Sequence, residues 1–409
     1  MYYGFDKSRY KENKRAVDNK NMGPLVNTIM TRCIHCSRCV RFATEVAGVP
    51  ELGMLGRGEN AEITTYLEQS ITSELSGNVI DLCPVGALTS KPYQFKARPW
   101  ELKRTDSIDI FDSVGSNIRV DSRAEEILRV TPRTNEYINE EWISDKVRFH
   151  YDGYYHQSID IPYIKENQKL SISNWEESLK VLKDKLKTLK PLALIGEHVD
   201  LETGYAIKKF MSNYGKDNVE CRTDNHAILE SLDSYRFNTP LNDIENSDLI
   251  ILVGTNPKIE TPIINHKIFK AYNNDAKVFN IGENISLNYK TEYLGESLSN
   301  LNNENLIKAL KKSTNPLIII GSAFLNKIKN IKTLKSIFSY ADKYKVITKE
   351  KNNLNFLNPY ASRVGQLIIG NTTNKLCEPF SNLKKDNFEL VLSWLLYTSP
   401  SPRDIRRSR

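Results

Sequence analysis

The sequence predicts an α+β fold followed by an α/β fold: a cysteine-rich segment, a small antiparallel β unit and a parallel α/β domain. Three observations support this order. Four of the six cysteines lie between positions 33 and 83. Short stretches of alternating apolar and polar residues follow over 101–135, which is typical of paired strands. From about residue 170, strand-sized apolar runs alternate with helix-sized amphipathic stretches, which favours a parallel sheet.

The chain has 409 residues, which is too long for one ordinary hydrophobic core. The changes in sequence character place the boundaries. They are, in order, a cluster-binding segment at 1–100, a small β unit at 101–160, an α/β domain at 161–395 and a tail at 396–409. The α/β pattern stops without a natural end at this tail, so we expect it to be disordered or foreign to the fold.

Within the first segment we expect loops and short helices, one of them near 25–30. The β unit should contain three strands, at 107–111, 117–120 and 127–130, with turns at 115–117 and 123–126. A capping box at 173–176 opens an amphipathic helix that ends near Leu189, and a second helix follows at 200–214. The expected parallel strands are 191–196, 249–254, 277–281, 317–321 and 345–348.

The cysteines carry the chemistry. Cys33, Cys36 and Cys39 are separated by two residues each, and a distant Cys83 is followed by Pro84. Three closely spaced thiolates and a remote Cys-Pro form the ligand pattern of one [4Fe–4S] cubane in ferredoxins. Zinc is the main alternative, because four cysteines can also hold it in a tetrahedron. Zinc sites usually pair their cysteines two by two, so the spacing favours the cubane.

Several neighbours of the motif need a separate interpretation. His35 lies inside the motif, and with four cysteines available we expect it to be a neighbour rather than a ligand. Arg32, Arg38 and Arg41 either raise the potential of a negatively charged cluster or form ordinary surface charge and pairs with Glu45. The two cysteines outside the motif, Cys221 and Cys377, are expected to be structural thiols.

Composition excludes several functions. The net charge of +7 is spread over lysine-rich surface segments, and the basic run 403–409 lies at the extreme end without interleaved aromatics. No nucleic-acid partner is therefore expected. No apolar run is long enough to cross a bilayer. Gly56-Arg57-Gly58 lacks the third glycine of a dinucleotide fingerprint and the helix that should follow it. We therefore expect no catalytic residue, no flavin and no NADH oxidation on this chain alone.

Longer segments around these motifs resemble the largest iron–sulfur subunit of respiratory complex I, the NADH:quinone oxidoreductase. The resemblance is nearly unbroken over 4–155 and weaker over 190–290, where Leu252-Val253-Gly254-Thr255-Asn256-Pro257 matches the family's molybdopterin-oxidoreductase-like part. The segments that carry it are 31–36, 38–42, 56–58, 73–92, 97–101 and 139–146.

The resemblance implies that Cys33, Cys36, Cys39 and Cys83 hold one cubane in the electron chain between flavin and quinone. It implies peripheral-arm subunits as partners, among them the flavin subunit that binds NADH. It also implies a place on the matrix side of the mitochondrial inner membrane, or on the cytoplasmic face of a bacterial membrane, with membrane association only through the complex.

This sequence departs from the family in three ways. The family's N-terminal [2Fe–2S] domain and its histidine-ligated cubane should precede Gly4, so we expect a separate chain to supply them. Residues 100–150, where some members carry a further cluster, contain no cysteine. The chain also stops short of the usual C-terminus. We therefore interpret it as a fragment or as one piece of a split subunit.

Two other functions compete with this hypothesis. The first is a molybdopterin-dependent oxidoreductase of the formate-dehydrogenase type, which shares the α/β architecture. Such an enzyme needs cysteines at the start of the β unit and often one on the metal, and residues 100–220 have none. We therefore expect no molybdopterin here. The second is a structural scaffold in which the cluster only stabilises the fold.

Overall fold

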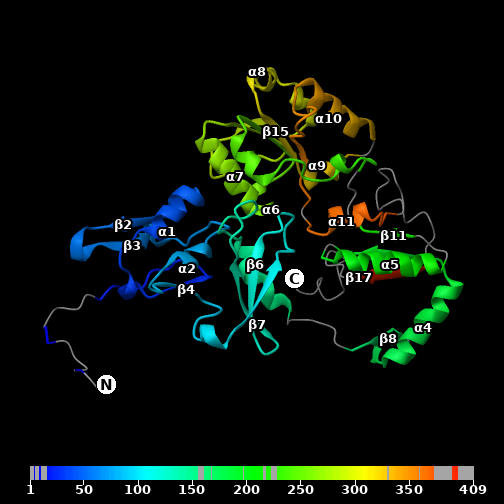
Figure 1. Cartoon of the computed structure of the whole chain (residues 1–409), viewed down its shortest axis with the longest axis horizontal. Coiled ribbons are helices and arrows are strands. Elements are labelled where there is room, and N and C mark those ends of the chain that lie inside the picture. Colours follow the sequence, from blue (N-terminus) through cyan, green and yellow to red (C-terminus); the bar gives the residue numbers. More distant parts are fainter. Residues whose placement is uncertain are drawn as a thin grey trace.

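The computed structural model describes most of the chain (Figure 1). The described residues are 4, 9–10, 16–154, 161–166, 168–196, 198–214, 218–222, 228–328, 331–358, 360–372 and 389–394. Within them, no helix combines the length and the apolar character needed to span a membrane. The expected tail at 396–409 and Cys377 both lie outside the described residues.

The cysteine-rich segment is built from short elements around its own core. Two antiparallel pairs frame it: β1 (Val26–Thr28) with β4 (Leu88–Ser90), and β2 (Leu52–Leu55) with β3 (Glu62–Thr65). Between them lie α1 (Arg38–Arg41), a π-helical turn (Phe42–Val46) and α2 (Asn78–Leu82). The core gathers apolar side chains from all of these elements, including Phe42, Ile63 and Val79.

The β unit is a three-stranded antiparallel meander of β5 (Lys103–Ile108), β6 (Asn117–Arg123) and β7 (Glu126–Pro132). The turn between β6 and β7 places Ala124 at a φ of 53°, as a tight hairpin requires. A short helix, α3 (Asp145–Phe149), begins at the N-cap Ser144 and packs on β7. Figure 1 shows this unit between the cysteine-rich segment and the α/β region.

The α/β region contains two parallel sheets. The larger has the strand order β14-β13-β12-β15-β16, with bounds Glu292–Gly295, Lys277–Ile281, Leu249–Val253, Pro316–Ile320 and Leu354–Phe356. The smaller has the order β11-β10-β17, with bounds Val219–Glu220, Pro191–Ile195 and Leu390–Trp394. A hairpin precedes it, formed by β8 (Tyr163–Glu166) and β9 (Lys169–Ile172).

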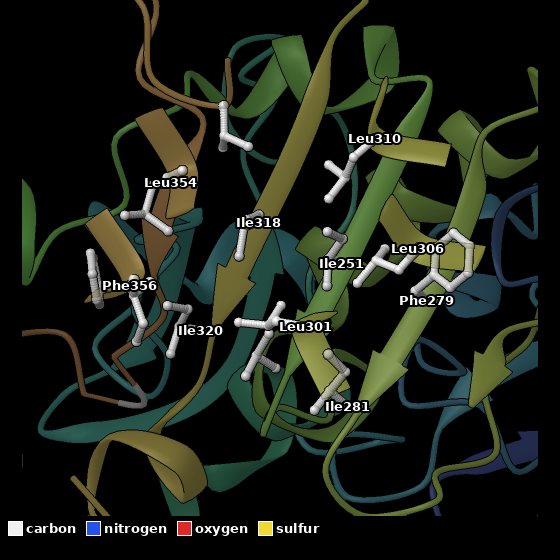
Figure 2. Packing of buried hydrophobic residues seen from close by; sticks show 14 of the residues in the cluster. Ile251, Phe279, Ile281, Leu301, Leu306, Leu310, Ile318, Ile320, Leu354 and Phe356 are labelled. Carbon is white, nitrogen blue, oxygen red and sulfur yellow. The ribbon is translucent and has the colours of Figure 1, made fainter. Parts of the chain in front are cut away.

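Helices cover both faces of the larger sheet, which explains why its central strands β12 and β15 are apolar throughout. Along β12, Leu249, Ile251 and Val253 pack on one face, while Ile250 and Leu252 pack on the other. Figure 2 shows the first of these cores between the sheet and its covering helices. The helices of the region are α4 (Trp175–Thr188), α5 (Leu201–Asn213), α6 (Pro257–Glu260), α7 (Pro262–Asn273), α8 (Glu304–Lys312), α9 (Ser322–Leu325), α10 (Ile331–Lys343) and α11 (Arg363–Ile368).

Helix α7 joins the larger sheet to the rest of the molecule. Its Ile263 packs into the core of the cysteine-rich segment, and the Nδ1 atom of its His266 lies 2.9 Å from the carbonyl oxygen of Val46. Lys267 is only 1% exposed, and its ammonium group binds Glu140 at 3.2 Å. Because an unpaired buried ammonium is costly, this network holds α7 in a defined position against the β unit.

Five sequence-based expectations about elements are corrected by the structure. Residues 25–30 form β1 and the start of a 3-10 turn rather than a helix, because they pair with β4. The strand expected at 107–111 ends at Ile108, and the strand expected at 345–348 is only an isolated bridge at Ile347, with β16 following it. The strand at 191–196 belongs to a separate smaller sheet. Helix α4 is capped by Asn174 rather than by Ser173.

Candidate metal centre

Four cysteines reach one place from two segments of the chain. Cys33 ends the 3-10 turn Met30–Arg32, Cys36 lies in the loop that follows, and Cys39 lies inside α1. Cys83 ends α2, where its backbone N–H donates to the carbonyl of Val79 at 3.2 Å. The pairing of β1 with β4 brings the two segments together, because these strands lie just before Cys33 and just after Cys83 in sequence.

The loop that carries the first three cysteines is wound into an unusual conformation. His35 and Ser37, which are not glycines, adopt φ angles of 55° and 57° in the left-handed region. Such residues cost of order 1 kcal/mol or more each and persist where function over-determines the backbone. Backbone N–H groups approach two of the four sulfur atoms. The N–H of His35 donates to Cys33 Sγ at 3.4 Å, and the N–H of Leu88 donates to Cys83 Sγ at 3.4 Å.

All four cysteines line a single cavity, part of which is open to solvent. The other lining residues are apolar except for Arg38; they include Met30, Ile63, Leu82 and Leu88. Among the described residues, no group of three or more His, Cys, Asp or Glu side chains is arranged to hold a single metal ion. The four sulfurs thus surround a space, as the corners of a four-iron cube require, with one thiolate for each iron.

The acidity of Cys39 reflects its surroundings. Burial, with smaller contributions from the nearby Cys33, Cys36 and Cys83, raises the pKa of Cys39 to about 11. A thiol in this position stays protonated in the metal-free chain. Metal binding would displace the proton, since only the thiolate is a ligand. The donor set therefore fits an iron–sulfur cluster.

Polar contacts from the β unit hold the second half of the site. Asn78, at the start of α2, donates to the carbonyl of Ile143 at 2.8 Å and accepts from Arg148 at 3.2 Å. Arg148 also binds Asp81 on α2 at 2.5 Å. Asp145 accepts from the N–H of Gly77 at 2.6 Å. Sequence reasoning missed these supporting residues, since the partners lie 65 to 70 positions apart and no local pattern links them.

The remaining sequence candidates take different places. His35 contacts a cysteine through its backbone, as expected of a neighbour. Arg41 donates to Glu45 at 3.1 and 3.3 Å, which matches the surface-pair alternative, whereas Arg38 lines the cysteine cavity. Cys221 is 3% exposed in the core of the smaller sheet, as expected of a structural thiol.

The fold and the cysteine cavity define the class of protein. The chain belongs to the molybdopterin oxidoreductase family, whose sequence model matches residues 159–402. The segment 23–89 matches the ferredoxin-like domain of NADH-quinone oxidoreductase subunit 3, and the segment 102–152 matches the NDSU1/NuoG-like 4Fe-4S domain of NADH-ubiquinone oxidoreductase. The domain composition predicted from the sequence, an iron–sulfur part followed by a molybdopterin-oxidoreductase part, is confirmed at this level.

The chain is also similar to subunits of NADH oxidoreductases from several organisms. The chain is 44% identical to the NADH-ubiquinone oxidoreductase 75 kDa subunit of Reclinomonas americana, over 96% of this chain and 60% of that protein. It is 42% identical to a NADH-quinone oxidoreductase subunit of Rickettsia bellii, over 91% of this chain and 56% of that protein. The resemblance to the largest iron–sulfur subunit of complex I is thereby confirmed. The chain spans only 60% of the first of these relatives and 56% of the second.

A plant relative extends the same likeness. NADH dehydrogenase [ubiquinone] iron-sulfur protein 1 of Solanum tuberosum is 44% identical, over 90% of this chain and 52% of that protein. Among solved structures, the formyltransferase/hydrolase complex of Methylorubrum extorquens aligns with a TM-score of 0.41 at 11% identity. That alignment covers 59% of this chain and 78% of the other. A likeness this distant carries no argument about function.

Proposed function

We propose that this chain relays single electrons through one [4Fe–4S] cluster, held by Cys33, Cys36, Cys39 and Cys83, as part of a NADH:quinone oxidoreductase of the complex I type. The observation that carries the proposal is the single cavity that all four cysteines line. The cluster would supply one-electron chemistry. The chain would supply the four thiolates, the two backbone N–H donors to sulfur and the apolar walls that limit access of water.

The arrangement favours a cubane over zinc. A structural zinc ion needs four ligands converging on one point at about 2.3 Å for each sulfur. Among the described residues, no three or more of these side chains converge on one point in that way. Hydrogen bonds to sulfur and a nearby arginine also stabilise the more negative reduced state of a cluster, which is useful to an electron carrier.

We further propose that the α/β region binds no molybdopterin, although its family is named for that cofactor. Ligands of parallel α/β sheets bind where strand order reverses, at the carboxyl ends of the strands. In the larger sheet this point lies between β12 and β15, where Gly254 and Gly321 pack closely. A Cβ on Gly321 would lie 2.5 Å from the Gly254 carbonyl oxygen, and one on Gly254 would lie 2.5 Å from Phe324 Cβ. The chain itself fills this position, which disfavours the formate-dehydrogenase alternative.

The same proposal assigns a role to each segment of the chain. Residues 1–100 bind the cluster, residues 101–160 form the β unit, and residues 161–395 form a docking platform for other subunits. The partners would be peripheral-arm subunits, including the flavin subunit that binds NADH, and a separate chain for the N-terminal clusters. The complex would lie on the matrix side of the mitochondrial inner membrane, or on the cytoplasmic face of a bacterial one.

Replacing each cysteine singly by serine tests the cluster assignment. Cys33→Ser, Cys36→Ser, Cys39→Ser and Cys83→Ser should each abolish the cubane, measured as iron and sulfide per purified chain. The buried Cys221→Ser is the matched control and should leave both contents unchanged. Full cluster occupancy after loss of any one of the four would overturn the assignment. Potentiometric EPR on the reconstituted chain then separates a carrier from a scaffold, because a scaffold cluster need not cycle between redox states.

Two further measurements test the rest of the proposal. Stoichiometric pterin or molybdenum in the native protein would contradict the absence of molybdopterin. The reconstituted chain should also fail to pass electrons from NADH to ferricyanide unless the flavin subunit is added, because a cluster moves one electron and NADH delivers a hydride. Rapid turnover by the chain alone would show that it is a catalytic subunit.

A further inference from the structure

The loop between β5 and β6 buries three polar side chains that the proposed electron relay does not use. Asp109 and Asp112 are each 2% exposed, and Ser116 is fully buried. Carboxyl groups are rarely this buried unless they are paired with a cation. This loop lies in the segment matched by a 4Fe-4S domain, yet 102–152 contains no cysteine, so a thiolate-ligated cluster does not account for the burial.

The backbone brings these side chains together. The N–H of Asp109 donates to the carbonyl of Ser116 at 2.9 Å, which extends the β5–β6 ladder by one pair beyond Ile108 and Asn117. Residues directly opposite each other on antiparallel strands project to the same face, so the Asp109 and Ser116 side chains share one face of the ladder. The carboxyl groups of Asp109 and Asp112 are close enough to interact through their charges.

The two carboxyl groups accept hydrogen bonds from backbone N–H groups of their own loop. One oxygen of each is occupied: Asp109 Oδ1 accepts from the N–H of Phe111 at 2.8 Å, and Asp112 Oδ1 accepts from the N–H of Val114 at 2.9 Å. In the described part of the chain, Asp109 Oδ2 and the Ser116 hydroxyl have no hydrogen-bond partner. Two buried carboxyl groups this close are stable only if a proton or another cation lies between them.

The basic groups around the loop are directed elsewhere. Lys146 on α3 donates to the carbonyl of Phe111 at 2.7 Å, and His198, which follows β10, lies with Nδ1 2.9 Å from the carbonyl of Ile110. His150 and His198 both pack edge-on against the Phe111 ring. Burial, followed by the charge of Asp112, raises the pKa of Asp109 to about 8, and burial also raises the pKa of Asp112. Lys146 opposes both shifts without cancelling them.

We propose that Asp109 and Asp112 share one proton at neutral pH, and that loss of this proton in mildly alkaline solution loosens the joint that the loop forms. Val114, in the middle of the loop, packs against both the core of the cysteine-rich segment and one core of the larger sheet. Lys146 and His198 tie the same loop to α3 and to the region after β10. Two adjacent charges of the same sign at this point would repel strongly, because the surroundings have a low dielectric constant.

The pH dependence of folding tests the shared proton. The pKa of the Asp109 carboxyl is 3.8 in the unfolded chain and about 8 in the folded chain. Between these two pH values the carboxyl is protonated when the chain is folded and ionised when it is unfolded. The folding equilibrium constant should therefore fall by about tenfold per pH unit between ~4 and 8, and level off above. Asp109→Asn removes the titrating carboxyl group and keeps a side chain of nearly the same shape. Its folding constant relative to wild type should thus rise about tenfold per pH unit from pH 5 to 8.

Asp106→Asn is the matched control, since Asp106 lies on β5 with its side chain 60% exposed. The ratio of its folding equilibrium constant to that of wild type should not change with pH.

An infrared titration of the wild-type chain tests the shared proton without any variant. A protonated-carboxylic-acid carbonyl band should persist at pH 7, disappear above pH 8, and be missing in Asp109→Asn. A flat ratio for Asp109→Asn, no such band at pH 7, or one tightly bound divalent metal per chain that Asp109→Asn abolishes would each overturn the proposal.

Discussion

Arg38 offers a direct test of how the chain tunes its cluster. Both Arg38 and Arg41 lie on α1, next to the cysteines, but their environments differ. Arg38 lines the cysteine cavity, whereas Arg41 is bound to Glu45 at 3.1 and 3.3 Å and is exposed. Only the charge of Arg38 should act on the cluster. Replacing it in Arg38→Gln removes a cation that stabilises the more negative, reduced state, so the reduction potential should fall.

The size of the effect follows from Coulomb's law. At a separation of ~7 Å, a unit charge contributes about 0.6 kcal/mol in water and about 2.4 kcal/mol at an effective dielectric constant of 20. Because Arg38 is exposed, screening places the effect in the lower half of this range. For a one-electron couple, in which about 1.4 kcal/mol corresponds to 59 mV, this gives a drop of roughly 25–60 mV.

Potentiometric EPR on the reconstituted chain measures this shift. Arg41→Gln is the matched control and should move the potential by much less, since Glu45 already compensates its charge. Iron and sulfide contents must match wild type in both variants, so that a change in potential reflects charge rather than incomplete assembly. The reasoning fails if the two variants shift the potential equally, or if Arg38→Gln leaves it unchanged.

Two other predictions concern the stability of the fold. Glu140→Gln should lower the free energy of unfolding by about 2 kcal/mol at pH 7, because it weakens the network around the buried Lys267. His266, followed by Lys270, holds the pKa of Glu140 well below its usual range, so this stabilisation should be present above pH ~4.5 and fade as the pH falls. Chemical denaturation from pH 3 to 7 should therefore show the free energies of unfolding of wild type and Glu140→Gln converging in acid. A difference between them that stays constant with pH would contradict the reasoning. Gly321→Ala should cost about 1–3 kcal/mol, since its Cβ would lie 2.5 Å from a backbone oxygen. Gly53→Ala, whose Cβ would meet nothing within 4 Å, should be nearly neutral by the same measurement, and equal losses would refute the packing argument.

The sequence-based predictions of elements failed where the local pattern and contacts outside it favour different structures. Residues 25–30 have a helical pattern, yet they form β1 because β4 offers a partner far along the chain, with Val26 paired to Ser90 and Thr28 to Leu88. The alternation over 107–111 predicts a strand, but Asp109 and Asp112 bond to the backbone two residues ahead and turn the chain into a loop. Neither outcome could be read from neighbouring residues.

The sequence by itself determined the cysteine motif and the longest apolar strands, because each is a local property. Cys33, Cys36 and Cys39 have the spacing that lets three sulfurs face one space, and the run 249–254 is apolar throughout because both faces of its sheet are buried. Only the tertiary structure decided which arginine faces the cysteines and which residues brace Cys83. It also decided the division of the strands between two sheets. Those features depend on groups that meet only after the chain has folded, since Asn78 reaches Arg148 across 70 positions of sequence.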